Sequence, residues 1–194
     1  VNKEYSKVKE QWVVQTGVGI YCSPAVENDK VFVGDDLGCL TAYALKNGKK
    51  LWSFASGKRI VGTPAVSQGI VVFGSADRNI YGLNVADGSL RWKVEASEPV
   101  LGAVTIHEGM AYVGASDKTF RAIDIQSGKV VWNYDQVKGY IETKPLIADN
   151  KVIFSAWDNT LYALDKATGK EIWKWTGGLT RMHFSPAAVW PVAS

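Results

Sequence analysis

The chain has 194 residues, and 46% of them are hydrophobic, so it is long enough to bury a full core. Its 22 basic and 19 acidic residues give a net charge of +3, which is too small to indicate a nucleic-acid partner. No stretch is apolar over the length that a membrane-crossing helix needs, so we expect a folded domain without a transmembrane segment.

Tryptophan recurs along the chain at a nearly constant interval of 40 or 41 residues. The residues that share this period are Trp12, Trp52, Trp92, Trp132 and Trp173. Self-similarity at a fixed period near 40 is typical of repeat architectures. The period therefore predicts that the chain is built from consecutive copies of one structural unit.

Each copy contains four short runs of strand composition, separated by turn residues. In the first copy these runs cover residues 23–26, 31–34, 40–43 and 50–54. The corresponding runs lie at 63–66, 71–74 and 80–83 in the second copy, at 103–106, 111–114 and 120–123 in the third, and at 144–147, 152–155 and 161–164 in the fourth. The run with the periodic tryptophan follows a turn that ends in glycine: Asn47-Gly48, Asp87-Gly88, Ser127-Gly128 or Thr168-Gly169. Such turns favour tight hairpins, so each copy reads as four antiparallel strands.

Four antiparallel strands in a unit of about 40 residues are the design of a β-propeller blade. We therefore expect an all-β propeller with four complete blades, at residues 18–57, 58–97, 98–138 and 139–179. Residues 1–17 read as the outer strand of a preceding blade, with the strand itself over residues 9–14. Residues 180–194 read as the start of a further blade, so the prediction is one partial β-propeller over residues 1–194.

A longer motif, Ala-x-Asp-x-x-x-Gly-x-x-x-Trp, surrounds the turn before the periodic tryptophan. It is complete in the last two blades, at Ala122, Asp124, Gly128 and Trp132 and at Ala163, Asp165, Gly169 and Trp173. The first two blades depart from it, with Ala42, Ala44, Gly48 and Trp52 and with Gly82, Asn84, Gly88 and Trp92. With these motifs the chain resembles the quinoprotein-type, or PQQ-like repeat, β-propeller family. That family includes the lipoprotein propeller of the outer-membrane barrel-assembly machinery and propeller domains fused to bacterial kinases or phosphatases.

The resemblance implies a structural role, called tryptophan docking, for the periodic residues. Each tryptophan would lay its ring against the neighbouring blade, a small residue would leave room for the ring, and the glycine would let the hairpin close. The residues given this role are Trp12, Trp52, Trp92, Trp132, Trp173, Gly48, Gly88, Gly128 and Gly169. Related rings commonly have seven or eight blades. The resemblance therefore implies either a fragment of a longer polypeptide or two chains that complete one ring, and open blade edges would favour association.

Cys22 and Cys39 are the only cysteines in the sequence. In the register of the repeat, Cys22 lies on the first strand of its blade and Cys39 at the start of the third, about 10 Å apart across two strand spacings. A disulfide needs Cα atoms within about 7 Å of one another. We therefore expect two free and largely buried thiols.

Ligands of propellers usually gather at one end of the central channel, where the loops into each first strand meet the loops between the second and third strands. The first kind of loop places Tyr21, Val61, Leu101, Glu142 and His183 at one position, and the second kind supplies Asp36, Asp77, Asp117 and Asp158. Trp157 lies outside the docking register and is the strongest candidate for a contact residue. The candidate ligand- or partner-binding residues are Trp157, Asp158, Asn159, Glu142, Arg181 and His183. An alternative stays open, in which Trp157 packs over a loop and each aspartate caps its own turn.

Three functions are compatible with these residues. The leading hypothesis is a non-catalytic propeller that serves as a protein-interaction, scaffold or sensor domain of a longer polypeptide, with no catalytic residue, metal site or cofactor expected. One alternative is a PQQ- and calcium-dependent alcohol or sugar dehydrogenase domain, for which Glu142, Asp158 and Asn159 offer calcium-ligand types. Another is sensing of a small ligand or glycan at the channel mouth. The resemblance implies a periplasmic or cell-surface location in bacteria.

Overall fold

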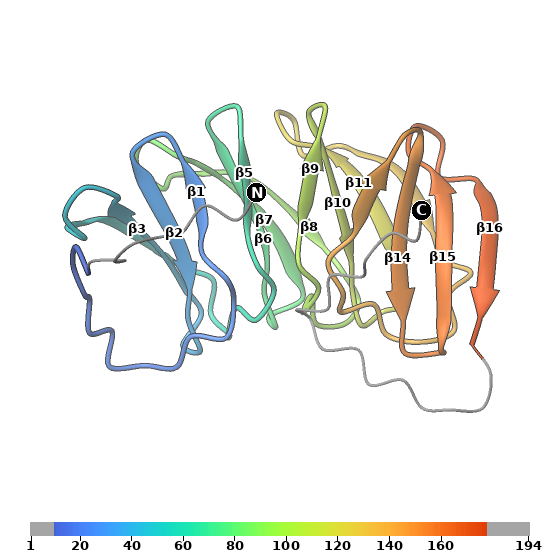
Figure 1. Cartoon of the computed structure of the whole chain (residues 1–194), viewed down its shortest axis with the longest axis horizontal. Helices are drawn as coiled ribbons and strands as arrows, with labels where there is room; N and C mark the ends of the chain where they lie inside the picture. Colours follow the sequence, from blue (N-terminus) through green and yellow to red (C-terminus); the bar gives the residue numbers. More distant parts are fainter. Residues whose placement is uncertain (1–9, 178–194) are drawn as a thin grey trace, which may run out of the picture.

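The computed structural model describes residues 10–177, so the predictions for residues 1–9 and 178–194 fall outside it. Within the described range, sixteen strands form four antiparallel sheets (Figure 1). Each sheet keeps its strands in chain order, so consecutive strands are hydrogen-bonded neighbours. Over these same residues, no helix is both long and apolar enough to cross a membrane. The predicted all-β architecture of four-stranded antiparallel blades is confirmed.

Each blade has a short first strand followed by three longer ones. Blade 1 contains β1 (Ala25–Glu27), β2 (Lys30–Gly34), β3 (Cys39–Ala44) and β4 (Lys50–Ala55). Blade 2 contains β5 (Ala65–Ser67), β6 (Ile70–Gly74), β7 (Asn79–Asn84) and β8 (Leu90–Glu95). Blade 3 contains β9 (Thr105–His107), β10 (Met110–Gly114), β11 (Phe120–Asp124) and β12 (Val130–Tyr134). Blade 4 contains β13 (Leu146–Ala148), β14 (Lys151–Ala156), β15 (Thr160–Asp165) and β16 (Glu171–Thr176).

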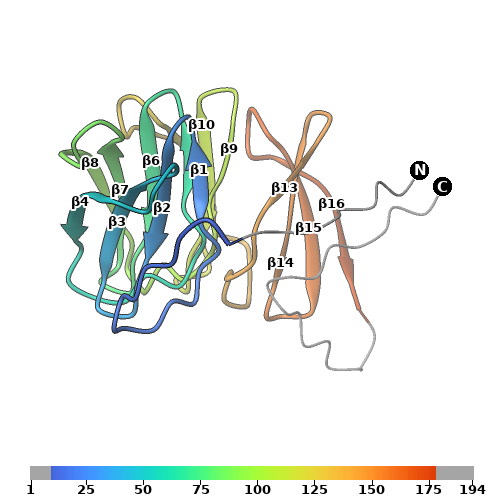
Figure 2. The ribbon, with the colours of Figure 1, turned by 60° about the vertical axis from the view of Figure 1, so that its left-hand side comes forward.

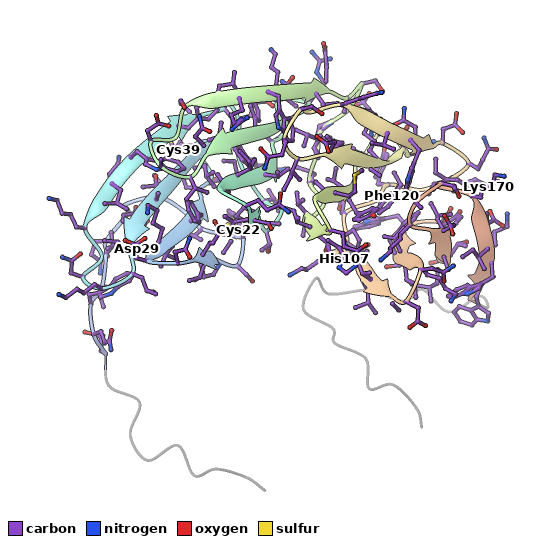
Figure 3. The ribbon with its side chains drawn as sticks, turned by 90° about the horizontal axis from the view of Figure 1, so that it is seen from above. Cys22, Asp29, Cys39, His107, Phe120 and Lys170 are labelled. Atoms are coloured by element: carbon purple, nitrogen blue, oxygen red, sulfur yellow. The ribbon has the colours of Figure 1, made fainter. Side chains whose placement is uncertain are left out.

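The blades follow an arc, and their first strands lie toward its hollow side (Figure 3). Strand β5 contacts both β1 and β9, as the innermost strands of adjacent blades do. Cys22, just before β1, and His107, at the end of β9, both lie on the concave side in this view. The described chain is therefore an open arc of a propeller, with the channel wall on its concave side.

The hydrophobic core lies between the blades. Phe32 of blade 1 and Phe73 of blade 2 belong to one buried cluster, and a second cluster joins blades 2 and 3 around Val113. Between blades 3 and 4, the rings of Phe120 and Phe154 stack with their centroids 4.0 Å apart. Because a single sheet cannot bury both of its faces, stacking on the neighbours is what removes its apolar surface from water.

The third and fourth strands of every blade lose register at the same point. The shift follows Ala42, Gly82, Ala122 or Ala163, and each of these small residues pairs with the periodic tryptophan of its own blade. At Gly82, an added Cβ would overlap the ring of Trp92. The small residue thus leaves the space that the ring fills, and the bulge sets the direction of the outer strand.

The tryptophan of one blade also contacts the next blade. Its indole N–H donates to a backbone carbonyl there: Trp52 to Val85, Trp92 to Ile125 and Trp132 to Lys166, at 3.1, 2.7 and 3.2 Å. The ring lies over the turn glycine three residues further on, where an added Cβ on Gly88, Gly128 or Gly169 would come within 2.5–2.6 Å of ring atoms. These glycines also have φ between +72° and +74°. Each glycine therefore meets two demands, a left-handed backbone and an absent side chain.

Trp12 contacts blade 1 in the same way. Its Nε1–H donates to the Leu45 carbonyl at 2.8 Å, and its ring lies over Gly48. Residues 10–16 nevertheless form no strand, whereas the sequence predicts a strand over residues 9–14. A strand needs a hydrogen-bonded neighbour, and the described residues pair none with this segment. Trp12 is therefore held by its own ring and not by a ladder of backbone hydrogen bonds.

Both cysteines are free thiols, as expected. Cys39 begins β3, but Cys22 precedes β1, whereas the sequence analysis places it on that strand. Its Sγ lies 3.3 Å from the Gly34 carbonyl and donates to it. Burial raises the pKa of the Cys22 thiol, so this thiol stays protonated at neutral pH.

Candidate functional site

Two kinds of loop meet at one end of the blades, which we call the loop end. Leading loops run into the first strand of each blade, at residues 17–24, 56–64, 96–104 and 135–145. Hairpin loops join the second and third strands, at residues 35–38, 75–78, 115–119 and 157–159. Both kinds of loop lie where the sequence analysis expects a propeller to bind its ligands.

Backbone hydrogen bonds connect the two kinds of loop into one surface. Within each blade the hairpin loop donates to the leading loop: Asp36 to Gly19, Ala76 to Arg59, Ser116 to Pro99 and Trp157 to Tyr140, at 2.9–3.0 Å. Each following leading loop donates to the preceding hairpin loop: Ile60 to Asp35, Val100 to Ser75 and Ile141 to Ala115, at 2.9–3.2 Å. Leading loops therefore sit between two hairpin loops, and the scaffold holds both in place.

The leading loops surround an open pocket of about 610 Å³. Four lining residues occupy one position in successive blades, the position at which ligand contacts are expected: Tyr21, Val61, Leu101 and Glu142. The remaining lining residues lie close by in the same loops: Ser23, Arg59, Gly62, Thr63, Ala103 and Lys144. The other two candidates on this stretch, Arg181 and His183, lie outside the described residues.

The pocket carries charges of both signs. Glu142 and Lys144 line it from one leading loop and Arg59 from another. The backbone N–H of Ser23 donates to Thr63 Oγ1 at 3.2 Å, which ties the leading loops of blades 1 and 2 together. Charged and hydroxyl groups beside aliphatic side chains suit a group that is polar at one end and apolar at the other.

The repeated aspartates hold their own hairpin loops. Asp77, Asp117 and Asp158 each accept the N–H of the residue two positions later at Oδ1, over 3.0–3.1 Å. Their Oδ2 atoms accept the side chains of Tyr81, Arg121 and Tyr162 in the same order. This geometry supports the structural interpretation, in which each aspartate caps its own turn.

Both oxygens of Asp158 are engaged. Oδ1 accepts the Thr160 N–H at 3.1 Å, and Oδ2 accepts the Lys138 N–H at 3.0 Å and the Tyr162 hydroxyl at 2.6 Å. Burial and the bond to Asp158 raise the pKa of Tyr162 to about 12, so the hydroxyl remains a donor at neutral pH. Asp158 therefore fixes the loop that presents Trp157.

Blade 1 departs from this pattern. Leu37 stands where the other blades have the capping aspartate, and Asp35 takes over by accepting the N–H groups of Leu37 and Cys39 at 3.0 and 2.8 Å. Asp36 is therefore not the residue that caps its own turn. Asp36 shares its position with Trp157 instead, because each donates its backbone N–H to the leading loop of its own blade.

Asn159 supplies the left-handed backbone conformation of its turn. It has a φ of +62°, as Arg78 and Lys118 have +75° and +65° at the same position of blades 2 and 3. Its carbonyl accepts the Gly177 N–H at 2.9 Å. With Asp158 engaged and Asn159 placed by its turn, these residues do not fit a calcium-ligand set. Across residues 10–177 no three His, Cys, Asp or Glu side chains are grouped as a metal site needs.

Trp157 projects from the loop end, with 66% of its surface exposed. Its backbone is fixed, because it donates to the Tyr140 carbonyl at 3.0 Å and Gly139 packs closely against it. Tyr140 itself is half exposed. The structure thus places a largely exposed tryptophan and a half-exposed tyrosine on adjacent, hydrogen-bonded loops.

Sequence reasoning missed Arg59 and Tyr140. They occupy the same position of the leading loop, where blades 1 and 3 have Gly19 and Pro99. This column lies two residues before the one that contains Val61 and Glu142. The change from glycine and proline to a cation and an aromatic side chain is the signal that could have identified both.

The chain is similar to known proteins in sequence pattern and in fold. The family model described as outer membrane protein assembly factor BamB matches residues 5–92, 40–173 and 135–192. No curated protein matches the chain significantly.

Three solved structures illustrate the similarity in fold. BamB from Moraxella catarrhalis has a TM-score of 0.76 at 17% identity, with 84% of this chain and 52% of that chain covered. The computationally designed Ika8 protein has 0.74 at 23% identity, with 81% and 49% covered. The computationally designed Ika4 protein has 0.74 at 19% identity, with 82% and 99% covered. The chain therefore spans about half the length of the first two proteins.

Proposed function

This chain belongs to the family of the outer membrane protein assembly factor BamB, and from that premise we propose that it is a non-catalytic propeller whose loop end binds a protein partner. It acts as an interaction, scaffold or sensor domain, and its four blades are part of a longer polypeptide or of a larger ring. The family's description supports a location on the periplasmic side of the outer membrane.

The observation that carries this proposal is the pair of exposed aromatic residues on a rigid loop end. Tryptophan and tyrosine contribute large contact areas at a small cost in side-chain entropy, and they dominate the energetics of many protein interfaces. Trp157 and Tyr140 project from loops that are already hydrogen-bonded to each other. Their backbones need no reordering when a partner binds, which favours affinity.

The neighbouring pocket extends this surface. Glu142, Lys144 and Arg59 supply charges of both signs beside aliphatic side chains. A partner could place one polar or charged side chain there while it covers Trp157. Electrostatic complementarity of this kind determines which partner binds more than how tightly it binds.

Site-specific photo-crosslinking in the source cell tests the proposal. A photoreactive phenylalanine analogue replaces Trp157 or Tyr140, and a matched control places it at Ala167, an exposed residue in the turn between β15 and β16. We expect an adduct with one discrete protein from both loop-end positions and none from Ala167. An adduct that forms equally well from Ala167, or no adduct from either loop-end position, would overturn the proposal.

A further inference from the structure

The junction between blades repeats three times within the described chain. One side, the donor face, presents the periodic tryptophan. The other side, the acceptor site, presents a backbone carbonyl and the turn glycine three residues later, as with Val85 and Gly88. All three junctions have the same direction along the chain, so the arrangement is head-to-tail.

Blade 4 presents a donor face against which no described blade lies. Trp173 and Trp175 are 37% and 54% exposed, and Leu146 on β13 is exposed as well. Strand β16 lies at the outer edge of this last blade (Figure 2). The equivalent residues of blade 3, Trp132 and Tyr134, pack into the core that blade 3 shares with blade 4. The exposed tryptophans therefore form the surface that elsewhere in the chain is covered by another blade.

Blade 1 presents the matching acceptor site, and Trp12 already occupies it. The Leu45 carbonyl accepts the indole N–H at 2.8 Å, and an added Cβ on Gly48 would come within 2.7 Å of the ring. Residues 10–16 add no strand to the blade, so the ring and its hydrogen bond form this contact without a sheet behind them. The acceptor site thus takes a tryptophan ring from outside the blade.

The size of the arc indicates that a second copy of the chain covers the donor face and the acceptor site. The described arc superposes on about half of two propellers, with 52% and 49% of those chains covered. An arc of half a ring returns to its own start when a second, identical arc is joined to it head-to-tail. A head-to-tail interface that closes in this way produces a ring, and the joint buries apolar surface at both ends at once.

We propose that two copies of this chain join head-to-tail, with Trp173 of each copy entering the Leu45–Gly48 site of the other in place of Trp12. Trp12 then acts as an intramolecular plug that competes with the second copy. Under this proposal, the first and last blades form an interface with a second copy of the chain. The proposal does not depend on which partner binds at the loop end.

Sedimentation equilibrium of the 194-residue chain over a wide concentration range tests this proposal. We expect a reversible equilibrium between a species of 21.2 kDa and one of twice that mass. Trp173→Ala should weaken association by at least about tenfold, because the docking ring is lost. Trp12→Ala should strengthen it by a similar factor, because the competitor is removed. Leu90→Ala, which changes an exposed apolar residue on β8 of blade 2, away from both end blades, should leave it unchanged.

Three results would overturn the proposal. The first is a chain that stays monomeric at every concentration, both with Trp12 and in the Trp12→Ala variant. The second is a Trp173→Ala variant that associates as well as the unmodified chain. The third is a species of three or more copies, because such a species would mean that two copies do not close the ring. Trp173 is partly exposed and lies outside the inter-blade cores of the described residues, so the Trp173→Ala variant should fold. Its association therefore tests the proposal even if the Trp12→Ala variant does not fold.

Discussion

At the scale of single residues, the capping aspartate of each hairpin loop in blades 2 to 4 accepts a hydrogen bond from a side chain four residues later, but the type of that side chain differs between blades. Tyr162 donates its hydroxyl to Asp158, whereas Arg121, at the same position of blade 3, donates to Asp117 at 3.0 Å. The side chains of this ion pair are only 10% and 3% exposed. Burial acts to raise the pKa of Asp117, but the hydrogen bonds and positive charge of Arg121 outweigh it. The pKa therefore lies below its ordinary value of 3.8, and the charged form is stabilised.

This buried pair should make the protein sensitive to acid. Because the folded-state pKa of Asp117 is lowered, its contribution to stability is present above the unfolded value of 3.8 and is lost as pH falls below it. Asp117→Asn should lower the free energy of unfolding at pH 7 by about 3–5 kcal/mol, since it leaves Arg121 buried without its counter-charge. Urea unfolding at neutral pH and again below the pKa of Asp117 measures this loss, which should be smaller in acid.

Arg121→Tyr provides the matched control. It restores the tyrosine–aspartate pair that blades 2 and 4 already use. A charge-assisted hydrogen bond from a neutral hydroxyl to the carboxylate then replaces the ion pair, so the variant should lose much less stability than Asp117→Asn. Equal losses in the two variants, or a loss from Asp117→Asn that does not change with pH, would show that the ion pair has no such role.

At the scale of the structural element, the fourth-strand hairpins depend on glycine for two separable reasons. Gly169 has a φ of +72°, and an added Cβ would come within 2.6 Å of the Trp132 ring. Gly69, in the turn between the first two strands of blade 2 (β5 and β6), has a φ of +76°, but an added Cβ there would meet nothing within 4 Å. The two positions therefore share the backbone requirement and differ in the presence of a tryptophan ring from the preceding blade.

Alanine at these two glycines should separate the backbone requirement from the docking requirement. Gly69→Ala should lose about 1–2 kcal/mol, the usual cost of a left-handed alanine. Gly169→Ala should lose this and a further 1–3 kcal/mol or so, because the added methyl group overpacks the site of the ring. Chemical denaturation of both variants measures the difference. If the two losses are the same, the ring of Trp132 does not constrain the turn.

At the scale of the whole molecule, stability comes from contacts between neighbouring blades. The three buried clusters join blades 1 and 2, 2 and 3, and 3 and 4. Such a chain behaves as a row of units, each coupled only to the units beside it. Damage at one junction should therefore loosen one part of the arc before the rest.

Trp132→Ala should release blade 4 in preference to blades 1 and 2. Removing the ring takes away the bond to the Lys166 carbonyl and the packing on Gly169, at a cost of about 3–5 kcal/mol. Hydrogen exchange should then accelerate in β13–β16 and stay slow in β1–β8. Trp157→Ala, which removes an equally large but exposed ring, should leave both rates unchanged. Acceleration of the same size in all four blades would contradict the nearest-neighbour description.

The candidate site was only partly predictable. The position that contains Tyr21, Val61, Leu101 and Glu142 could be read from the repeat, and these residues do line one pocket. Arg59 and Tyr140 were not identified, because their importance comes from hydrogen bonds to hairpin loops 17 residues further along each blade. Asp158 and Asn159 were read as contact residues, and only the structure shows that the Asp158 carboxylate accepts hydrogen bonds within the loops and that Asn159 has a left-handed backbone.

The sequence by itself determined the number of described blades, their strand order and the residues at their junctions. It could do so because strand periodicity, turn glycines and a tryptophan every 40 or 41 residues act locally and repeat. The tertiary structure decided which aspartate caps each loop, that Trp12 docks without forming a strand, and which side chains are left exposed at the loop end and on blade 4. These outcomes depend on hydrogen bonds and packing between segments distant in the chain, and no local pattern carries that information.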